Sequence, residues 1–336
     1  MGNFWAGRPV LVTGGAGFIG SHLVRRLVRA GALVRVVDNL SRGSAAPDNG
    51  VEFWEGDLTD PGVCRAACQG MEVVFHLAAR VGGVGYYLMR SSEVLGHNLL
   101  VDSLVLGAVL GAGVSRYFYA SSAHVYPLIR QQTPDALPLR EQDDFPADPP
   151  LSYGLAKLLS EQALLEGRKK GTPMPAAIFR LVGVYGEGQD IDLERGSAIP
   201  VLVRRAIEYP ERAPFIVRGT GEETRSYCYV GDVVDAILLG MEALDERNGI
   251  GPLNVGSDGM IRIREIAELI VRLSGKAIEI TYDRSFPTHI WGQRVDCSRA
   301  RALLGWVPQV SLEEGLRRVF ADAEIRLAAG TGPRAL

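Results

Sequence analysis

The first half of the chain alternates between two patterns of apolar residues. Short runs rich in β-branched and aromatic side chains predict buried strands, and longer stretches with apolar residues three and four positions apart predict amphipathic helices. The predicted strands cover residues 10–13, 33–37, 51–55, 73–77, 117–121 and 176–182, and the predicted helices cover residues 19–30, 61–68, 98–111 and 152–167. This order predicts an α/β fold, a doubly wound parallel sheet of the Rossmann type with right-handed crossovers.

The alternation ends after residue 182. The segment that follows is rich in glycine, proline and charge, with one predicted helix at 199–208, and a further helix at 230–244 could return to the sheet. Short strands and two amphipathic helices are predicted over residues 253–320.

These patterns predict two domains with a ligand bound between them. The Rossmann domain would comprise residues 1–182 together with 227–252, and a smaller C-terminal α/β lobe would comprise residues 183–226 and 253–327. Residues 328–336 are expected to form a flexible tail, as chain ends commonly do.

Composition narrows the class of protein. The 336 residues are 47% apolar and 22% charged, with a net charge of −3, which is ordinary for a soluble globular enzyme. A charge so close to zero argues against nucleic acid or a membrane surface as a partner. No continuous apolar run reaches the roughly 18 residues that a membrane helix needs, and the N-terminus lacks a signal-peptide pattern.

The four cysteines predict neither a metal site nor a disulfide framework. Only Cys64 and Cys68 are close in sequence, and their spacing of four in a predicted helix indicates packing. Such cysteine usage fits a reducing cytoplasm, which is the location we expect.

A dinucleotide site is predicted where the first strand ends. Glycines at Gly14, Gly17 and Gly20 lead into a helix, and this spacing lets backbone N–H groups approach a pyrophosphate at the positive end of that helix. The second strand ends at Asp38, whose carboxylate can bind the ribose hydroxyls and repel a 2′-phosphate, so we expect NAD. Arg42 leaves NADP as the alternative, because its cation could neutralise that phosphate.

A catalytic constellation is predicted at Ser122, Tyr153 and Lys157. Tyr153 and Lys157 lie four residues apart and therefore share one helix face. An ammonium group near a phenol favours the phenolate, which makes the tyrosine a usable base near neutral pH. Ser122 follows a predicted strand and could hydrogen-bond the same substrate oxygen.

Taken together, these motifs resemble the extended short-chain dehydrogenase/reductase family, the group of NAD-dependent nucleotide-sugar epimerases and dehydratases. The resemblance spans roughly residues 8–320, and its segments here are 13–20, 38–42, 56–58, 76–79, 219–232, 254–258 and 304–306, with Ser122, Tyr153 and Lys157. It implies that the cofactor contacts Gly14, Gly17, Phe18, Ile19, Gly20, Asp38, Asn39, Asp57, Leu58, Leu77, Ala78, Ala79, Asn98, Tyr153 and Lys157. It also implies that Arg225 meets the substrate diphosphate.

A closer likeness concerns residues 81–86 and 121–127, which resemble segments of GDP-mannose 3,5-epimerases and of GDP-fucose synthase. That likeness implies that Gly83, Val84 and Gly85 contact the substrate. His124 stands where those groups carry a cysteine that acts as base at C3 and C5 of the sugar. A neutral imidazole can do that work, although His124 could instead only shape the pocket.

The chain departs from the family at several positions. The acid that partners the C3/C5 base falls on Asp192, which could equally be an ordinary loop carboxylate, since an unperturbed aspartate is ionised at neutral pH. Gly183 replaces a usual asparagine. Trp291 replaces an expected arginine, for which Arg294 is a possible substitute in substrate binding.

The resulting expectation is an NAD-dependent nucleotide-sugar epimerase that acts through a transient 4-keto sugar. If His124 is a base, C5, C3 or both invert; if it is not, the ketone turns over and C4 inverts, as in an NDP-sugar 4-epimerase. A 4,6-dehydratase normally carries Asp-Glu where Ala123 and His124 stand. A non-catalytic NAD-binding protein is the alternative from another class.

Two predicted helices bear on the oligomeric state. Residues 98–111 and 152–167 resemble the pair that forms a four-helix dimer interface in this family, although their apolar residues could equally be intramolecular core. We expect a homodimer.

Overall fold

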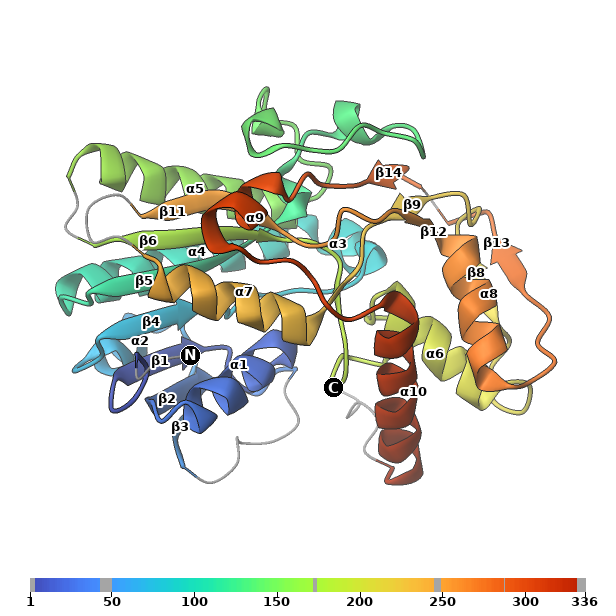
Figure 1. Ribbon diagram of the computed structural model, residues 1–336, viewed down its shortest axis with the longest axis horizontal. Helices are drawn as coiled ribbons and strands as arrows, with labels where there is room; N and C mark the ends of the chain where they lie inside the picture. The colour runs from blue at the N-terminus through green and yellow to red at the C-terminus, as the bar shows by residue number, and fades with distance from the viewer. Residues whose placement is uncertain (1–3, 43–49, 172–173, 245–248, 287, 331–336) are drawn as a thin grey trace.

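The computed structural model describes residues 4–42, 50–171, 174–244, 249–286 and 288–330 (Figure 1). Its centre is a sheet of seven parallel strands in the order β11, β6, β5, β4, β1, β2, β3. These strands are β1 (Pro9–Thr13), β2 (Leu33–Asp38), β3 (Val51–Glu55), β4 (Val73–His76), β5 (Arg116–Ser122), β6 (Ala176–Leu181) and β11 (Ile250–Val255). The predicted Rossmann-type α/β fold is confirmed.

Helices cover both faces of this sheet, because successive side chains of a strand point to opposite sides. On β1, Val10 and Val12 pack in the core formed with α1 (Phe18–Arg29) and α7 (Val230–Glu242). Leu11 belongs to the opposite core, with α2 (Pro61–Cys68), α4 (Ser91–Gly111) and α5 (Ser152–Lys169). The strands read as nearly continuous apolar runs for this reason.

The chain returns to the sheet late in the sequence. β11 pairs in parallel with β6, with Val255 opposite Leu181, so the returning segment continues three residues beyond the expected boundary at 252. Three helices follow in the described part of the chain, α8 (Ile263–Ser274), α9 (Ser298–Leu304) and α10 (Leu312–Ala328), where two were predicted. α9 escapes the sequence pattern because two turns are too short to show a helical period.

The C-terminal lobe is built beside the carboxyl ends of the strands. Its helices α6 (Ala198–Glu208), α8 and α10 pack on one another (Figure 1). Short strands complete the lobe and its border with the sheet: β7 (Val184–Tyr185) with β10 (Cys228–Tyr229), β8 (Ile216–Arg218) with β13 (Thr281–Asp283), and β9 (Thr224–Arg225) between β12 (Ile261–Arg262) and β14 (Gly292–Gln293). The expected tail begins where α10 ends, and residues 331–336 lie outside the described part.

α4 is longer than predicted and begins at Ser91, because its first residues, Ser91, Ser92 and Glu93, are polar and exposed and do not show the apolar period. Among the described helices it is the one whose length and composition would suffice to cross a membrane. Here it packs between α2 and α5. It also buries two polar side chains, Asn98 and Asp102, with hydrogen-bond partners inside the protein.

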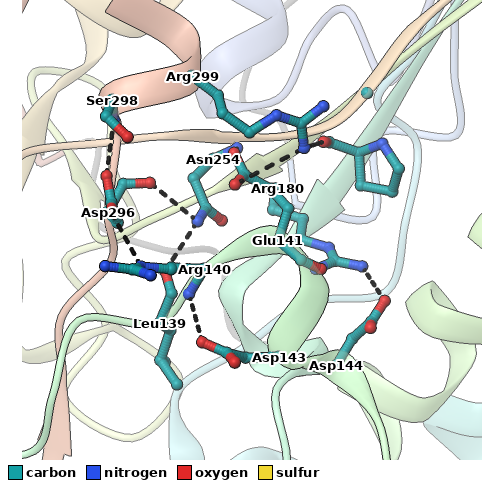
Figure 2. A network of polar contacts seen from close by, with 12 residues as sticks. Leu139, Arg140, Glu141, Asp143, Asp144, Arg180, Asn254, Asp296, Ser298 and Arg299 are labelled. Atoms are coloured by element: carbon teal, nitrogen blue, oxygen red, sulfur yellow. Dashed lines mark hydrogen bonds and ion pairs between the residues drawn. The ribbon is translucent and has the colours of Figure 1, made fainter.

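A polar network fixes the connection between β5 and α5 to the sheet (Figure 2). The fully buried Arg180 guanidinium of β6 donates to the Glu141 carbonyl at 2.8 Å and pairs with Asp144 at 2.6 Å. The Asn254 amide of β11 donates to the carbonyls of Leu139 at 3.0 Å and Asp296 at 3.2 Å. Residues 139–144, which include the 3₁₀ turn Glu141–Asp144, are therefore anchored beside the site described next.

Candidate active site

The turn between β1 and α1 forms a close-fitting cradle. Gly14 adopts φ of +69°, and a Cβ atom there would lie 2.8 Å from the Ala78 Cα. A Cβ atom at Gly20 would overlap the Gly14 carbonyl oxygen. Gly17 begins α1 without a side-chain cap, which leaves the backbone N–H groups of the first turn free for an anion. This cradle fits a dinucleotide pyrophosphate.

Asp38 stands at the end of β2, beside the glycine turn. Its carboxylate accepts the Ala16 N–H at 3.0 Å and the Leu40 N–H at 2.9 Å. Burial raises the pKa of Asp38, and these backbone bonds oppose the rise. Arg42 pairs with Asp190 at 2.7 Å and donates to the Val81 carbonyl. Because Arg42 is engaged in this way, the structure favours Asp38 as the group that meets the ribose.

The remaining cofactor residues line the same strand ends. Asp57 accepts the Thr59 N–H at 2.9 Å, which lowers the pKa of its carboxyl, and Leu58 is buried behind it. The N–H groups of Leu77 and Ala78 point to the Thr13 hydroxyl. The contacts of Leu77 and Ala78 hold the loop after β4 against the end of β1, where the glycine turn begins.

Asn98 acts through one of these loops. Its buried amide accepts the Arg80 N–H at 2.7 Å and donates to the Arg80 carbonyl at 3.1 Å. Both ends of the amide are therefore committed to the backbone just after Ala79. Asn98 shapes the segment that carries Leu77, Ala78 and Ala79, whereas we had expected a direct cofactor contact.

Ser122, Tyr153, Lys157 and His124 come together at the carboxyl end of β5 and the start of α5. Burial raises the pKa of the Tyr153 phenol well above its ordinary value, and a hydrogen bond with Ser122 opposes that rise. The Lys157 Nζ lies 6.0 Å from the centre of the Tyr153 ring. It is closer to Asp102, at 3.8 Å from Oδ1, a partner that the sequence did not reveal.

His124 lies in the 3₁₀ turn Ala123–Val125, with its ring centre 6.1 Å from that of Tyr153. Its Nδ1 atom is buried and has no hydrogen-bond partner among the described residues. Burial and the nearby Arg225 cation lower the pKa of His124 to about 4. The imidazole is therefore neutral near pH 7, with a ring nitrogen free to accept a proton.

Asp192 lies apart from this cluster, in the loop before α6. Its carboxylate accepts the N–H groups of Glu194 at 3.0 Å and Arg195 at 2.9 Å and lies 3.8 Å from the Arg195 Nε. Among the described residues, no contact joins it to His124. The carboxylate is held by donors of its own loop and contacts none of the cluster residues among those described, so the structure supports the loop role that the sequence had left open and not the catalytic one.

The glycine-rich segment 82–85 packs against the same loop. The Gly83 N–H donates to the Arg195 carbonyl at 3.0 Å, and a Cβ atom on Gly83 would lie 2.8 Å from the Gly196 oxygen. Val84 begins α3 (Val84–Met89), and Gly85 faces the Phe286 ring. This segment therefore packs against both the loop before α6 and Phe286.

Two arginines come from adjacent short strands on the lobe side. Arg225 of β9 is opposite Gln293 of β14, and Arg294 follows directly. The Arg225 guanidinium donates to the carbonyls of Thr224 at 2.7 Å and Ile290 at 2.8 Å. The Nε of Arg294 is buried without a partner among the described residues. Such a pair of cations suits a diphosphate.

The sequence missed two residues beside the phenol. Tyr87 of α3 stacks on Tyr153, and Asp102 of α4 faces Lys157. The available signal for Asp102 was a single acidic residue in the apolar stretch 99–106. Tyr87 gave no signal beyond its place shortly after the glycine-rich segment 82–85.

The sequence profile described as "NAD dependent epimerase/dehydratase family" matches residues 10–256. The chain belongs to this family. The GDP-mannose 3,5-epimerase of Arabidopsis thaliana is 31% identical to it over 312 residues, which cover 93% of this chain and 81% of the relative.

Solved structures of the family show the same fold. The UDP-glucose 4-epimerase of Thermotoga maritima, with UDP-glucose, superposes with a TM-score of 0.85 at 29% identity over 95% of this chain and 99% of that one. The UDP-glucose 4-epimerase of Thermus thermophilus, in complex with NAD, has a TM-score of 0.81 at 28% identity over 94% and 99% of the two chains. The cofactor of this family member is NAD, as the residues of its cradle had indicated.

Proposed function

We propose that this epimerase/dehydratase family member is a nucleotide-sugar epimerase that acts through a transient 4-keto sugar, most like a GDP-mannose 3,5-epimerase. The observation that carries the proposal is the neutral His124 imidazole beside Tyr153, with a buried Nδ1 atom that has no hydrogen-bond partner among the described residues. A ketone at C4 acidifies the protons on C3 and C5, and His124 is placed to remove one of them.

Each residue has a defined task in this scheme. Tyr153 takes the proton of the C4 hydroxyl while Ser122 holds the same oxygen, and Arg225 and Arg294 hold the diphosphate. The glycine turn and Asp38 would hold NAD, which would supply reversible hydride transfer at C4 without net consumption of the cofactor. His124 moves a proton at C3 or C5 while the ketone lasts.

A second candidate is an NDP-sugar 4-epimerase, in which the ketone turns over and C4 inverts. The placement of Asp192 favours it, because its carboxylate is held in its own loop and supplies no acid partner for His124. A 4,6-dehydratase is less well supported, since Ala123 and His124 occupy the positions of its acid pair. The complete set of Ser122, Tyr153 and Lys157 argues against a protein that only binds NAD.

The experiment offers GDP-, UDP-, dTDP- and CDP-sugars to the NAD-loaded enzyme in deuterated water. Deuterium at C3 or C5 of the epimerised sugar is the expected result. Epimerisation without deuterium supports the 4-epimerase instead, and no altered sugar contradicts both.

Two variants separate the roles of the residues. His124→Asn should lower deuterium incorporation by about 100-fold or more while the formation of reduced cofactor persists. Tyr153→Phe should abolish both. Incorporation that survives in His124→Asn would exclude His124 as the base.

The proposal includes a homodimer formed by α4 and α5. Leu100 and Leu159 are each 47% exposed, on the outer faces of two helices that pack side by side. Apolar residues on both inner and outer faces of α4 are typical of a helix with a partner on each side.

A further inference from the structure

Asp102 and Lys157 form a buried pair of opposite charges behind the catalytic phenol. Asp102 is 4% exposed and Lys157 is 1% exposed, and Oδ1 and Nζ are 3.8 Å apart. We infer that Asp102 is the counter-ion that keeps Lys157 protonated and in place, and so acts as a positioning residue for Tyr153. This inference rests on the proposed role of Tyr153 as the base.

The hydrogen bonds around Asp102 fit an ionised carboxylate, which can only accept them. The Thr13 hydroxyl oxygen accepts the N–H groups of Leu77 and Ala78, so its own hydrogen points to the His76 Nδ1 at 2.7 Å. The His76 Nε2 therefore carries the proton and donates it to Asp102 Oδ1 at 2.9 Å. His76 is thus a neutral donor, and its ring connects Thr13, at the start of the glycine turn, to the Asp102 carboxylate.

The other oxygen of Asp102 is satisfied in the same way. Oδ2 accepts the Tyr119 hydroxyl at 2.6 Å and the Ser160 hydroxyl at 2.8 Å. Burial alone would raise the pKa of Asp102, but Lys157 and the His76 bond bring it to about 2. Three neutral donors spread the negative charge without cancelling it, so the charge still acts on Lys157.

Of the acidic groups around Lys157 that the structure describes, Asp102 is the one placed to pair with its ammonium group. The titratable groups that face the pair are His97 of α4, His76 of β4, Tyr117 and Tyr119 of β5, and Tyr153 and Glu161 of α5. Glu161 is engaged by Arg180 at 2.6 Å and by the Ser121 hydroxyl. Among the described residues, Asp102 is the carboxylate within 4 Å of the Lys157 Nζ.

Lys157 needs such a partner. Burial lowers the pKa of its ammonium, and Asp102 is the first of the groups that oppose this. A neutral amine cannot stabilise a phenolate, so loss of the carboxylate would leave Tyr153 in its protonated form. Removing the Asp102 carboxylate has two opposite effects on the pKa of Tyr153. It removes a negative charge that itself raises this pKa, and it removes the positive charge of Lys157 that lowers it. The inference requires the second effect to be the larger. Lys157 is adjacent to the phenol, and Asp102 lies behind it.

The test titrates the Tyr153 phenolate of the NAD-loaded enzyme by near-ultraviolet difference absorbance, with Tyr153→Phe in each background as the blank. No sugar is needed, so the result is independent of the proposed substrate. In Asp102→Asn the phenolate titration should move to higher pH by about one unit or more, a tenfold loss of phenolate at a given pH below it. A titration that stays in place or moves to lower pH overturns the inference.

Further variants separate charge from structure. Ser160→Ala removes one hydrogen bond from Asp102 but no charge, and Asp102→Glu retains the charge; both should titrate near the wild type. A shift in Asp102→Glu as large as that in Asp102→Asn contradicts a role for the charge. In the Lys157→Met background, Asp102→Asn should no longer move the titration to higher pH, because only the direct repulsion between the Asp102 carboxylate and the phenolate is left to remove.

Asp102→Thr serves if Asp102→Asn does not fold. Its hydroxyl can still bond Tyr119 and Ser160 without carrying a charge. It should move the titration in the same direction as Asp102→Asn, and an unmoved titration in a folded Asp102→Thr protein is equally decisive against the inference.

Discussion

Tyr87 and Tyr153 lie face to face, with ring centres 5.0 Å apart and ring planes inclined by 15°. Tyr87 comes from α3, directly after the glycine-rich segment, and its ring is also 6.2 Å from that of His124. The Tyr87 ring thus packs against both Tyr153 and His124, the two groups to which we assign proton transfer. Stacking of this kind removes water from the face of the phenol.

Replacing Tyr87 by alanine should therefore move the Tyr153 phenolate titration to lower pH, opposite to the shift expected for Asp102→Asn. Burial is the main cause that raises the pKa of Tyr153, and Tyr87 adds to it. Admitting water brings the pKa back toward its ordinary value of about 10. Difference absorbance of the NAD-loaded protein measures this. Tyr87→Phe keeps the stack and should titrate near the wild type; an unmoved Tyr87→Ala titration would show that the stack does not exclude water.

Gly20→Ala should weaken NAD binding by at least about tenfold, because the added Cβ atom would overlap the Gly14 carbonyl and open the cradle. Calorimetric titration with NAD measures the affinity. Gly111→Ala at the exposed end of α4 is the control, since a Cβ atom there meets nothing within 4 Å. Equal affinities of the two variants would contradict the assignment of this turn to the pyrophosphate.

The Arg42–Asp190 ion pair should slow the exchange of NAD. It joins the loop after β2, on the side of the sheet where we expect the cofactor, to the loop before α6 of the C-terminal lobe. Both side chains are about one quarter exposed, so the pair contributes no more than about 1 kcal/mol and NAD should leave about threefold faster in Asp190→Asn. Displacement by excess labelled NAD gives the rate. Arg42→Gln removes the other member of the pair and should speed release to a similar extent, and unchanged release in both variants argues against a role for the ion pair.

Leu100→Glu combined with Leu159→Glu should convert the proposed dimer into monomers, because the buried carboxylates would face one another across the interface. Sedimentation velocity reports the oligomeric state. Ile325→Glu on α10, where the side chain is 69% exposed, is the control and should leave the state unchanged. A wild type that sediments as a monomer contradicts the dimer itself.

Most of the fold and part of the candidate site could be predicted from local patterns in the sequence. The β1 strand, its glycine turn and α1 were predictable because apolar periodicity and the positive φ at Gly14 are properties of a short segment. Tyr153 and Lys157 were predictable for the same reason, since helix geometry places residues four apart on one face.

What escaped prediction depends on contacts between distant segments. Asp102 meets Lys157 only because α4 and α5 pack together, and Tyr87 meets Tyr153 only because α3 folds over the start of α5. The role of Asp192 likewise could not be decided from its position in the sequence. Its neighbours in the loop, Glu194 and Arg195, had to be placed before its hydrogen bonds were known.

Gly154 fixes the relation between the two proposed bases. It follows Tyr153 directly, and any larger residue would overlap the carbonyl oxygen of His124, so the first turn of α5 rests on the backbone of His124. The backbones that carry the phenol and the imidazole are therefore packed directly on one another. Side chains elsewhere in the site can change without altering the spacing between the two proposed bases, because that spacing is set by a backbone contact.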